Sequence, residues 1–169
     1  RLQDILDTSE PPAVSVRETF DFWVDPEAAG ENEQARQVIE EAIERAKDEI
    51  APTRPVPGVE HAYWCRLGSK EFVRWVRGED EDEFFNAFAR IYAARESDLE
   101  EGARFVGAFR ANGVAIPVWE LVPGTEAEEL TKPLQAMGKR LDAALADESP
   151  LTPEVRRAKA GIISRQVNL

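Results

Sequence analysis

Residues 103–121 read ARFVGAFRANGVAIPVWEL. Two runs rich in aromatic and β-branched residues flank Asn112-Gly113. This dipeptide favours a two-residue hairpin turn more strongly than any other short signal, because both residues tolerate a positive φ. The stretch therefore predicts a β-hairpin with strands at 103–111 and 114–121.

A second hairpin is predicted earlier in the chain, with strands at 59–67 and 70–76 joined by Gly68-Ser69. A helix is expected to follow each hairpin, so the chain contains two hairpin–helix units. At an offset of 44 residues the units align Arg66 with Arg110, Gly68 with Asn112, Phe72 with Ile116 and Trp75 with Trp119. These few matches leave open whether the units arose by duplication.

The first half of the chain also carries a strand signal and two helix signals. Alternating aromatic residues predict a strand at 18–24. Apolar residues at three- and four-residue spacings predict a helix over 31–50. A second helix is predicted over 80–95, where an acidic first turn favours the helix dipole and a stripe of phenylalanines supplies a buried face.

Capping signals place the helices of the C-terminal part. Thr125 is predicted to cap a helix, with Glu128 completing a capping box. Pro133 is expected to break or restart that helix before 134–146. A Thr-Pro pair, typical of an N-cap and first helical residue, predicts a last helix over 152–166.

These elements predict an α+β fold. We expect a mainly antiparallel sheet of about five strands, built from the two hairpin–helix units, with the helices gathered mostly on one face. Residues 1–17 are predicted to form an arm or linker, and residues 18–169 a single domain. Because the chain begins at Arg1 without a methionine, we expect it to be a fragment of a longer protein.

Composition restricts the function. The formal net charge of −12 argues against binding nucleic acid or an anionic membrane surface, since both need cationic contacts. The single cysteine fits the reducing cytoplasm. Cys65 and His61 lie four residues apart in an expected strand, about 13 Å, which is too far for a Cys–His dyad or a shared metal. We therefore expect no metal site and no cofactor, and no catalytic residue can be selected.

The candidate site is one face of the predicted sheet. Side chains alternate between the two faces of a strand, and Phe105, Phe109, Ile116 and Val118 share the face on which we expect the helices to pack. The opposite, outer face is rich in tryptophan and arginine, residues enriched at binding hot spots. We call it the Trp/Arg face, and its predicted partner-binding residues are Trp64, Arg66, Trp75, Arg104, Arg110 and Trp119. The alternative is that another element packs on this face: the 18–24 strand, the last helix, or a missing N-terminal region.

The chain also resembles a known family. The residues that carry the likeness are Phe20-Asp21-Phe22-Trp23-Val24, Ala62-Tyr63-Trp64-Cys65-Arg66, Phe105-Val106-Gly107-Ala108-Phe109-Arg110, Ile116-Pro117-Val118-Trp119, Pro123-Gly124-Thr125-Glu126-Ala127-Glu128 and Ser164-Arg165-Gln166. They resemble an actinobacterial family of unknown function along essentially the whole chain. Longer members of that family carry a zinc-binding SEC-C motif, named for the C-terminal tail of SecA. One cysteine and one histidine cannot form that motif here. The resemblance implies a cytoplasmic fragment and carries no activity.

Three functions follow from the sequence. The leading hypothesis is a non-enzymatic interaction domain whose Trp/Arg face binds a protein partner or the missing N-terminal region. The order of helices and hairpins, which is similar to that of small secretion-chaperone-like binding domains, supports it by analogy alone. The alternatives are a hydrolase or transferase that uses carboxylates and arginines, and a purely structural supporting domain. A homodimer through the sheet face or the last helix is also compatible with the sequence.

Overall fold

The computed structural model describes residues 32–111 and 113–164, and its contacts divide the chain into two units, 1–50 and 51–169. The described part of the first unit is helix α1 (Glu33–Glu49), which confirms the helix predicted over 31–50. Its N-cap is Asn32, whose Oδ1 accepts hydrogen bonds from the backbone N–H groups of Gln34 and Ala35. The strand predicted at 18–24 and the boundary predicted at 17/18 lie outside the described residues.

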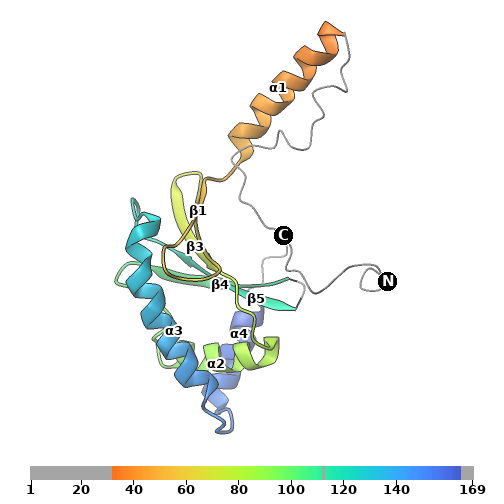
Figure 1. Cartoon of the computed structure of the whole chain (residues 1–169). Coiled ribbons are helices and arrows are strands. Elements are labelled where there is room, and N and C mark those ends of the chain that lie inside the picture. The colour runs from red at the N-terminus through yellow and green to blue at the C-terminus, as the bar shows by residue number, and fades with distance from the viewer. Residues whose placement is uncertain (1–31, 112, 165–169) are drawn as a thin grey trace, which may run out of the picture. The chain divides into compact units, whose positions relative to one another are not determined.

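The second unit is built on a five-stranded antiparallel sheet with the strand order β1-β2-β3-β5-β4 (Figure 1). Both predicted hairpins are present. The strands are β1 (Thr53–Pro55), β2 (Ala62–Leu67), β3 (Lys70–Trp75), β4 (Arg104–Ala111) and β5 (Val114–Glu120). Strand β1 lies in a segment expected to be a proline-stiffened loop, and proline is compatible with it because β1 lies at a sheet edge.

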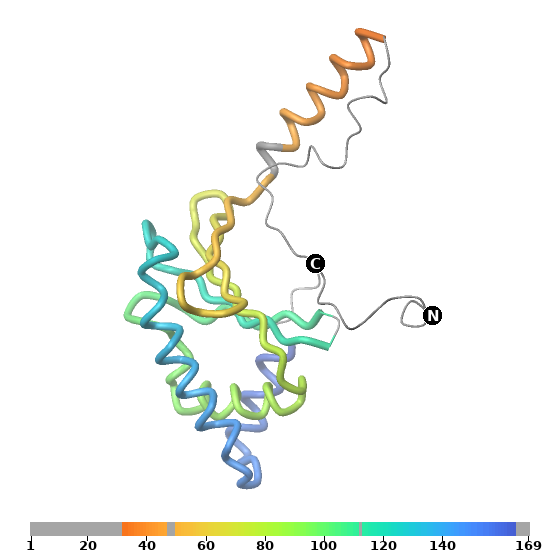
Figure 2. Tube along the Cα trace, in the orientation of Figure 1, coloured from red at the N-terminus to blue at the C-terminus, as the bar shows by residue number. Residues whose placement is uncertain are grey.

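Helices cover one face of this sheet (Figure 1). They are α2 (Glu81–Ala93), the short 3-10 helix η4 (Ala127–Leu130), α3 (Thr131–Leu145) and α4 (Pro153–Ser164). Helix α2 packs against both α3 and α4, although α4 lies about 70 residues further along the chain, and Figure 2 shows the three tubes side by side. The predicted α+β class is confirmed, with the helices on a single face.

The helix ends follow capping chemistry, with one correction. Asp80 caps α2 by accepting from the N–H groups of Asp82 and Glu83. The capping box predicted at Thr125 lies one residue later, at Glu126 and Glu129. The Thr125 hydroxyl instead donates to the carbonyl of Val122 in the preceding turn. Pro133 lies within the first turn of α3, where no intrahelical N–H bond is lost.

The assignment of the two sheet faces from the sequence is wrong. Cross-strand pairs place Trp64 against Val73, and Val73 against Trp119, on one face, as predicted. However, that face lies under the helices: Trp64 is 1% exposed, Trp75 6% and Trp119 0%. Burial of these large rings removes more apolar area from water than burial of the opposite face would.

A β-bulge changes which residues of β4 belong to each face. The register between β4 and β5 shifts between Phe105 and Gly107, so that Val106 is an extra residue in the strand. Arg104 therefore pairs with Glu120 on the face opposite the tryptophans, whereas Phe105 pairs with Trp119 and joins the core. The prediction that Arg104 shares the Trp/Arg face, and that Phe105 shares a face with Phe109, is wrong for this reason.

Candidate functional site

The predicted site residues Trp64 and Arg66 belong to a charged cluster at the end of β2. The guanidinium groups of Arg66 and Arg54 lie over the Trp64 ring, 5.3 and 5.5 Å from its centroid. Arg66 Nε donates to Glu71 Oε1 at 3.1 Å, and Arg54 Nη1 donates to Glu126 Oε2 at 3.0 Å. The cluster therefore covers the rim of a buried tryptophan with paired charges.

Glu71 is the buried carboxylate of this cluster. It is 5% exposed, and its Oε2 atom is buried and accepts no hydrogen bond in the described structure. It forms the desolvated carboxylate–arginine pair that the hydrolase or transferase alternative requires. Neither Glu71 nor Arg66 lines the groove described below.

The other predicted site residues have separate partners, and the two arginines among them form ion pairs. Arg110 pairs with Glu81 and lies over the Phe85 ring, and Arg104 pairs with Glu120 at 2.8 Å. The Trp75 indole donates to the carbonyl of Glu60. The structure thus brings Trp64 and Arg66 together, while the six residues do not converge on one open surface. Direct contact between the three tryptophans and a partner would require the helices to move off the sheet.

The sheet face opposite the helices is a second candidate surface. Strands β2, β3, β4 and β5 all contribute to it, and no described helix of the second unit lies over it (Figure 1). We call it the open face and define it by Tyr63, Cys65, Phe72, Arg74, Phe109, Ile116 and Val118. Most of these side chains are half-buried, whereas Cys65 and Val118 are almost fully buried. The centre of the open face is therefore apolar apart from Arg74. Lys70, Glu120 and Arg104 lie on the same face as an ion-paired cluster beside Phe72.

Cys65 and Arg74 interact electrostatically on the open face. Burial raises the pKa of the Cys65 thiol, and the charge of Arg74 opposes that shift. Sequence reasoning placed Phe109, Ile116 and Val118 together correctly, but assigned their face to the helices. One signal in the sequence could have identified the open face. Arg74 is charged and lies on the same side of β3 as Phe72, whereas Val73 and Trp75 lie on the other side.

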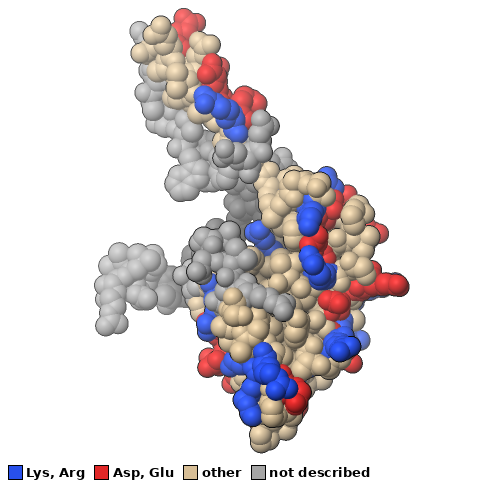
Figure 3. Space-filling view, turned by 180° about the vertical axis from the view of Figure 1, so that it is seen from behind, with Lys and Arg blue, Asp and Glu red and all other residues tan. Residues whose placement is uncertain are grey.

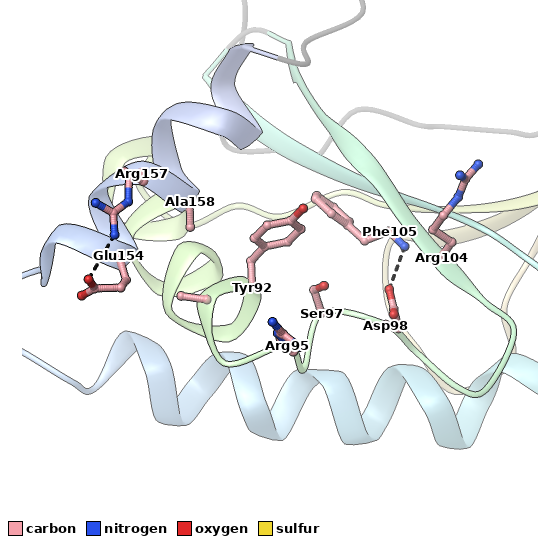
Figure 4. Close-up of a pocket in the computed structure, with 10 residues that line it drawn as sticks. Tyr92, Arg95, Ser97, Asp98, Arg104, Phe105, Glu154, Arg157 and Ala158 are labelled. Atoms are coloured by element: carbon pink, nitrogen blue, oxygen red, sulfur yellow. Dashed lines mark hydrogen bonds and ion pairs between the residues drawn. The ribbon is translucent and has the colours of Figure 1, made fainter.

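A groove of about 700 Å³ lies between the end of α2, the start of β4 and α4 (Figure 4). Its wall includes Tyr92 and Phe105, whose ring centroids lie 6.0 Å apart. Asp98 accepts a hydrogen bond from the backbone N–H of Phe105. In Figure 4 the side chains of Arg157 and Arg104 lie at opposite ends of the groove, and that of Arg104 points away from it. The arginines therefore do not converge on one point.

One carboxylate of the groove has a lowered pKa. The pKa of Glu154 lies below its usual range, chiefly because its own backbone N–H donates to it, with the Thr152 hydroxyl and then Arg157 adding to the shift. A general acid needs a carboxyl pKa raised toward neutrality, which is the opposite of the shift at Glu154.

Arg95, which lines the groove, has an unusual backbone conformation. It follows the C-cap of α2 with φ of 63°, and its N–H donates to Tyr92 O while the N–H of Glu96 donates to Ile91 O. This is a Schellman ending, in which glycine is preferred at the position of Arg95.

Replacing Arg95 with glycine should raise the free energy of unfolding by about 0.5 kcal/mol. The left-handed conformation costs a side-chain-bearing residue roughly 1–2 kcal/mol, and the greater chain entropy of unfolded glycine offsets part of that gain. Urea denaturation would measure the change. Arg95→Ala is the matched control, because it keeps the Cβ and should bring no gain. An equal gain in both variants would show that the arginine side chain, and not the backbone, is responsible.

Several ion pairs lie on the described surface. Seen from behind, basic and acidic side chains lie next to one another (Figure 3), in agreement with the pairs Lys70–Glu120, Arg90–Asp147 and Lys159–Asp82. Among the described residues, no group of three or more His, Cys, Asp or Glu side chains could hold a metal ion. No helix in those ranges is long and apolar enough to cross a membrane.

The fold and its surfaces define a small α+β domain: an antiparallel sheet with helices on one face and an apolar, arginine-bearing face on the other. The chain belongs to the family of unknown function DUF5926, which matches residues 1–169. Neither a curated protein nor a solved structure is significantly similar to it.

Proposed function

We propose that this chain is a protein-interaction domain that binds a partner through the open face. The observation that supports the proposal is the apolar centre of a sheet face over which no described helix of the second unit lies. An antiparallel sheet that faces water on one side normally presents polar residues there. Tyr63, Phe72, Phe109 and Ile116 are instead half-buried apolar or aromatic side chains on neighbouring strands. Contiguous apolar patches of this kind mark interaction surfaces.

One of the arginines predicted as partner contacts keeps a place in this proposal. Arg104 lies on the face opposite the tryptophans, and its side chain is 72% exposed despite its ion pair with Glu120. Polar groups at the rim of an interface add orientation more than affinity. The tryptophans would then support the interface as part of the core below the sheet.

The resemblance found in the sequence extends the proposal. It favours a cytoplasmic protein, and it makes a region outside this chain, such as the part that carries an SEC-C motif in longer relatives, a candidate partner. A second copy of the chain is the other candidate, and sedimentation velocity of the purified chain over a range of concentrations would identify a homodimer.

The binding proposal predicts that polar substitution of the open face abolishes partner capture. Wild type and Phe72→Ser would be immobilised, host proteins retained by the wild type identified by quantitative mass spectrometry, and the purified partner titrated against both. We expect at least a tenfold weaker dissociation constant for Phe72→Ser, because a fully desolvated aromatic anchor contributes about 1.5 kcal/mol or more.

The matched control is Val122→Ser, which also changes an exposed apolar residue but lies outside the open face. Far-ultraviolet circular dichroism would show that both variants are folded. A partner that binds wild type and Phe72→Ser equally well would contradict the proposed surface.

A further inference from the structure

Arg74 differs from the other arginines of the sheet. Arg66 pairs with Glu71, Arg104 with Glu120 and Arg110 with Glu81. Arg74 makes no hydrogen bond or ion pair with any described residue, and its Nε atom is buried without a hydrogen-bond partner. Its Nε atom is therefore a buried donor without an acceptor among the described residues.

The residues directly opposite Arg74 on the neighbouring strands carry no charge. Its cross-strand neighbours on the open face are Tyr63 on β2 and Val118 on β5. Phe72 precedes it by two residues on the same face, and the Cys65 thiol is close enough to feel its charge. A buried donor without an acceptor destabilises the free protein, and the guanidinium fork matches a carboxylate, which can accept two parallel hydrogen bonds.

We propose that the protein partner of the open face inserts an aspartate or glutamate, flanked by apolar side chains, against Arg74. This inference rests on the proposed function and names the chemistry of the partner. One carboxylate balances one guanidinium, whereas a phosphate would leave excess charge among apolar groups. Apolar neighbours in the partner would cover Phe72 and Tyr63, and the desolvated ion pair would fix the register of the two surfaces.

A second copy of the chain fits this surface less well than a different protein does. A two-fold contact between open faces would bring the same patch of each copy together. With Arg74 between Tyr63 and Val118 in the middle of the sheet, such a contact would place two guanidinium groups near each other. Glu120, a carboxylate on the same face, already pairs with Lys70 and Arg104. Like charges directly opposed are unfavourable.

Panning a phage library of random 12-residue peptides on the whole chain tests the inference without a known partner. Enriched peptides would be synthesised and titrated by fluorescence anisotropy. We expect them to carry Asp or Glu within an apolar run, and we expect Asn or Gln at that position to weaken binding about tenfold or more. Arg74→Met should weaken binding to a similar extent, and Arg74→Lys to an intermediate one.

Controls separate the two proposals. Arg95→Met removes an arginine outside the open face and should leave peptide affinity unchanged. Thermal unfolding of Arg74→Met should show no loss of stability, because the arginine has no partner to lose. If Phe72→Ser abolishes peptide binding but Arg74→Met does not, the open face binds and the carboxylate inference is wrong. If no enriched peptide depends on Phe72, the proposed function itself fails.

Discussion

Replacing Trp119 with alanine should lower the free energy of unfolding by about 4 kcal/mol, measured by urea denaturation. The side chain is fully buried, and its ring lies 5.8 Å from that of Phe105 and 6.0 Å from that of Phe88, centroid to centroid. Its Nε1 donates to the carbonyl of Ser97 at 2.7 Å. The alanine variant would leave a cavity between the sheet and α2 and a buried carbonyl without its donor.

Two controls identify the source of that effect. Trp119→Phe keeps most of the ring volume but loses the N–H, so it should cost about half as much. Val122→Ala changes an exposed residue of the loop after β5 and should alter the free energy of unfolding by less than about 0.5 kcal/mol. A loss below about 1 kcal/mol for Trp119→Ala would mean that the helices do not pack on the tryptophan face in solution.

The alternation of side chains along each strand could be predicted from the sequence. Which face of the sheet the helices cover could not. Both faces of β2, β3 and β5 are rich in apolar residues, so periodicity alone cannot distinguish them. Arginine beside the tryptophans suggested a solvated face. In the structure the guanidinium of Arg66 lies over the Trp64 ring at the rim of the core, where a long side chain can cover apolar surface and keep its charge in water.

The bulge in β4 and the short strand β1 could not be predicted from the sequence either. The bulge at Val106 reverses the side-chain direction of the start of β4, and a Val-Gly pair in a strand is too common to indicate a bulge. Strand β1 depends on its pairing with β2 and has little propensity of its own. In contrast, the Asn112-Gly113 and Gly68-Ser69 turns and the acidic first turn of the helix predicted over 80–95 are local signals, and the elements that they predicted are present.

Replacing Arg66 with alanine should lower the free energy of unfolding by about 2–3 kcal/mol, because Glu71 would remain buried without its charge partner. The value lies below the range for a fully buried pair, since Arg66 itself is 42% exposed. Glu71→Gln in the Arg66→Ala background should recover about half of the loss, because the neutral amide costs less to bury. Urea denaturation of both single variants and the double variant gives the coupling energy between the two residues. A coupling energy near zero would show that water reaches Glu71. The Arg66–Glu71 pair would then add nothing to the stability of this end of the sheet.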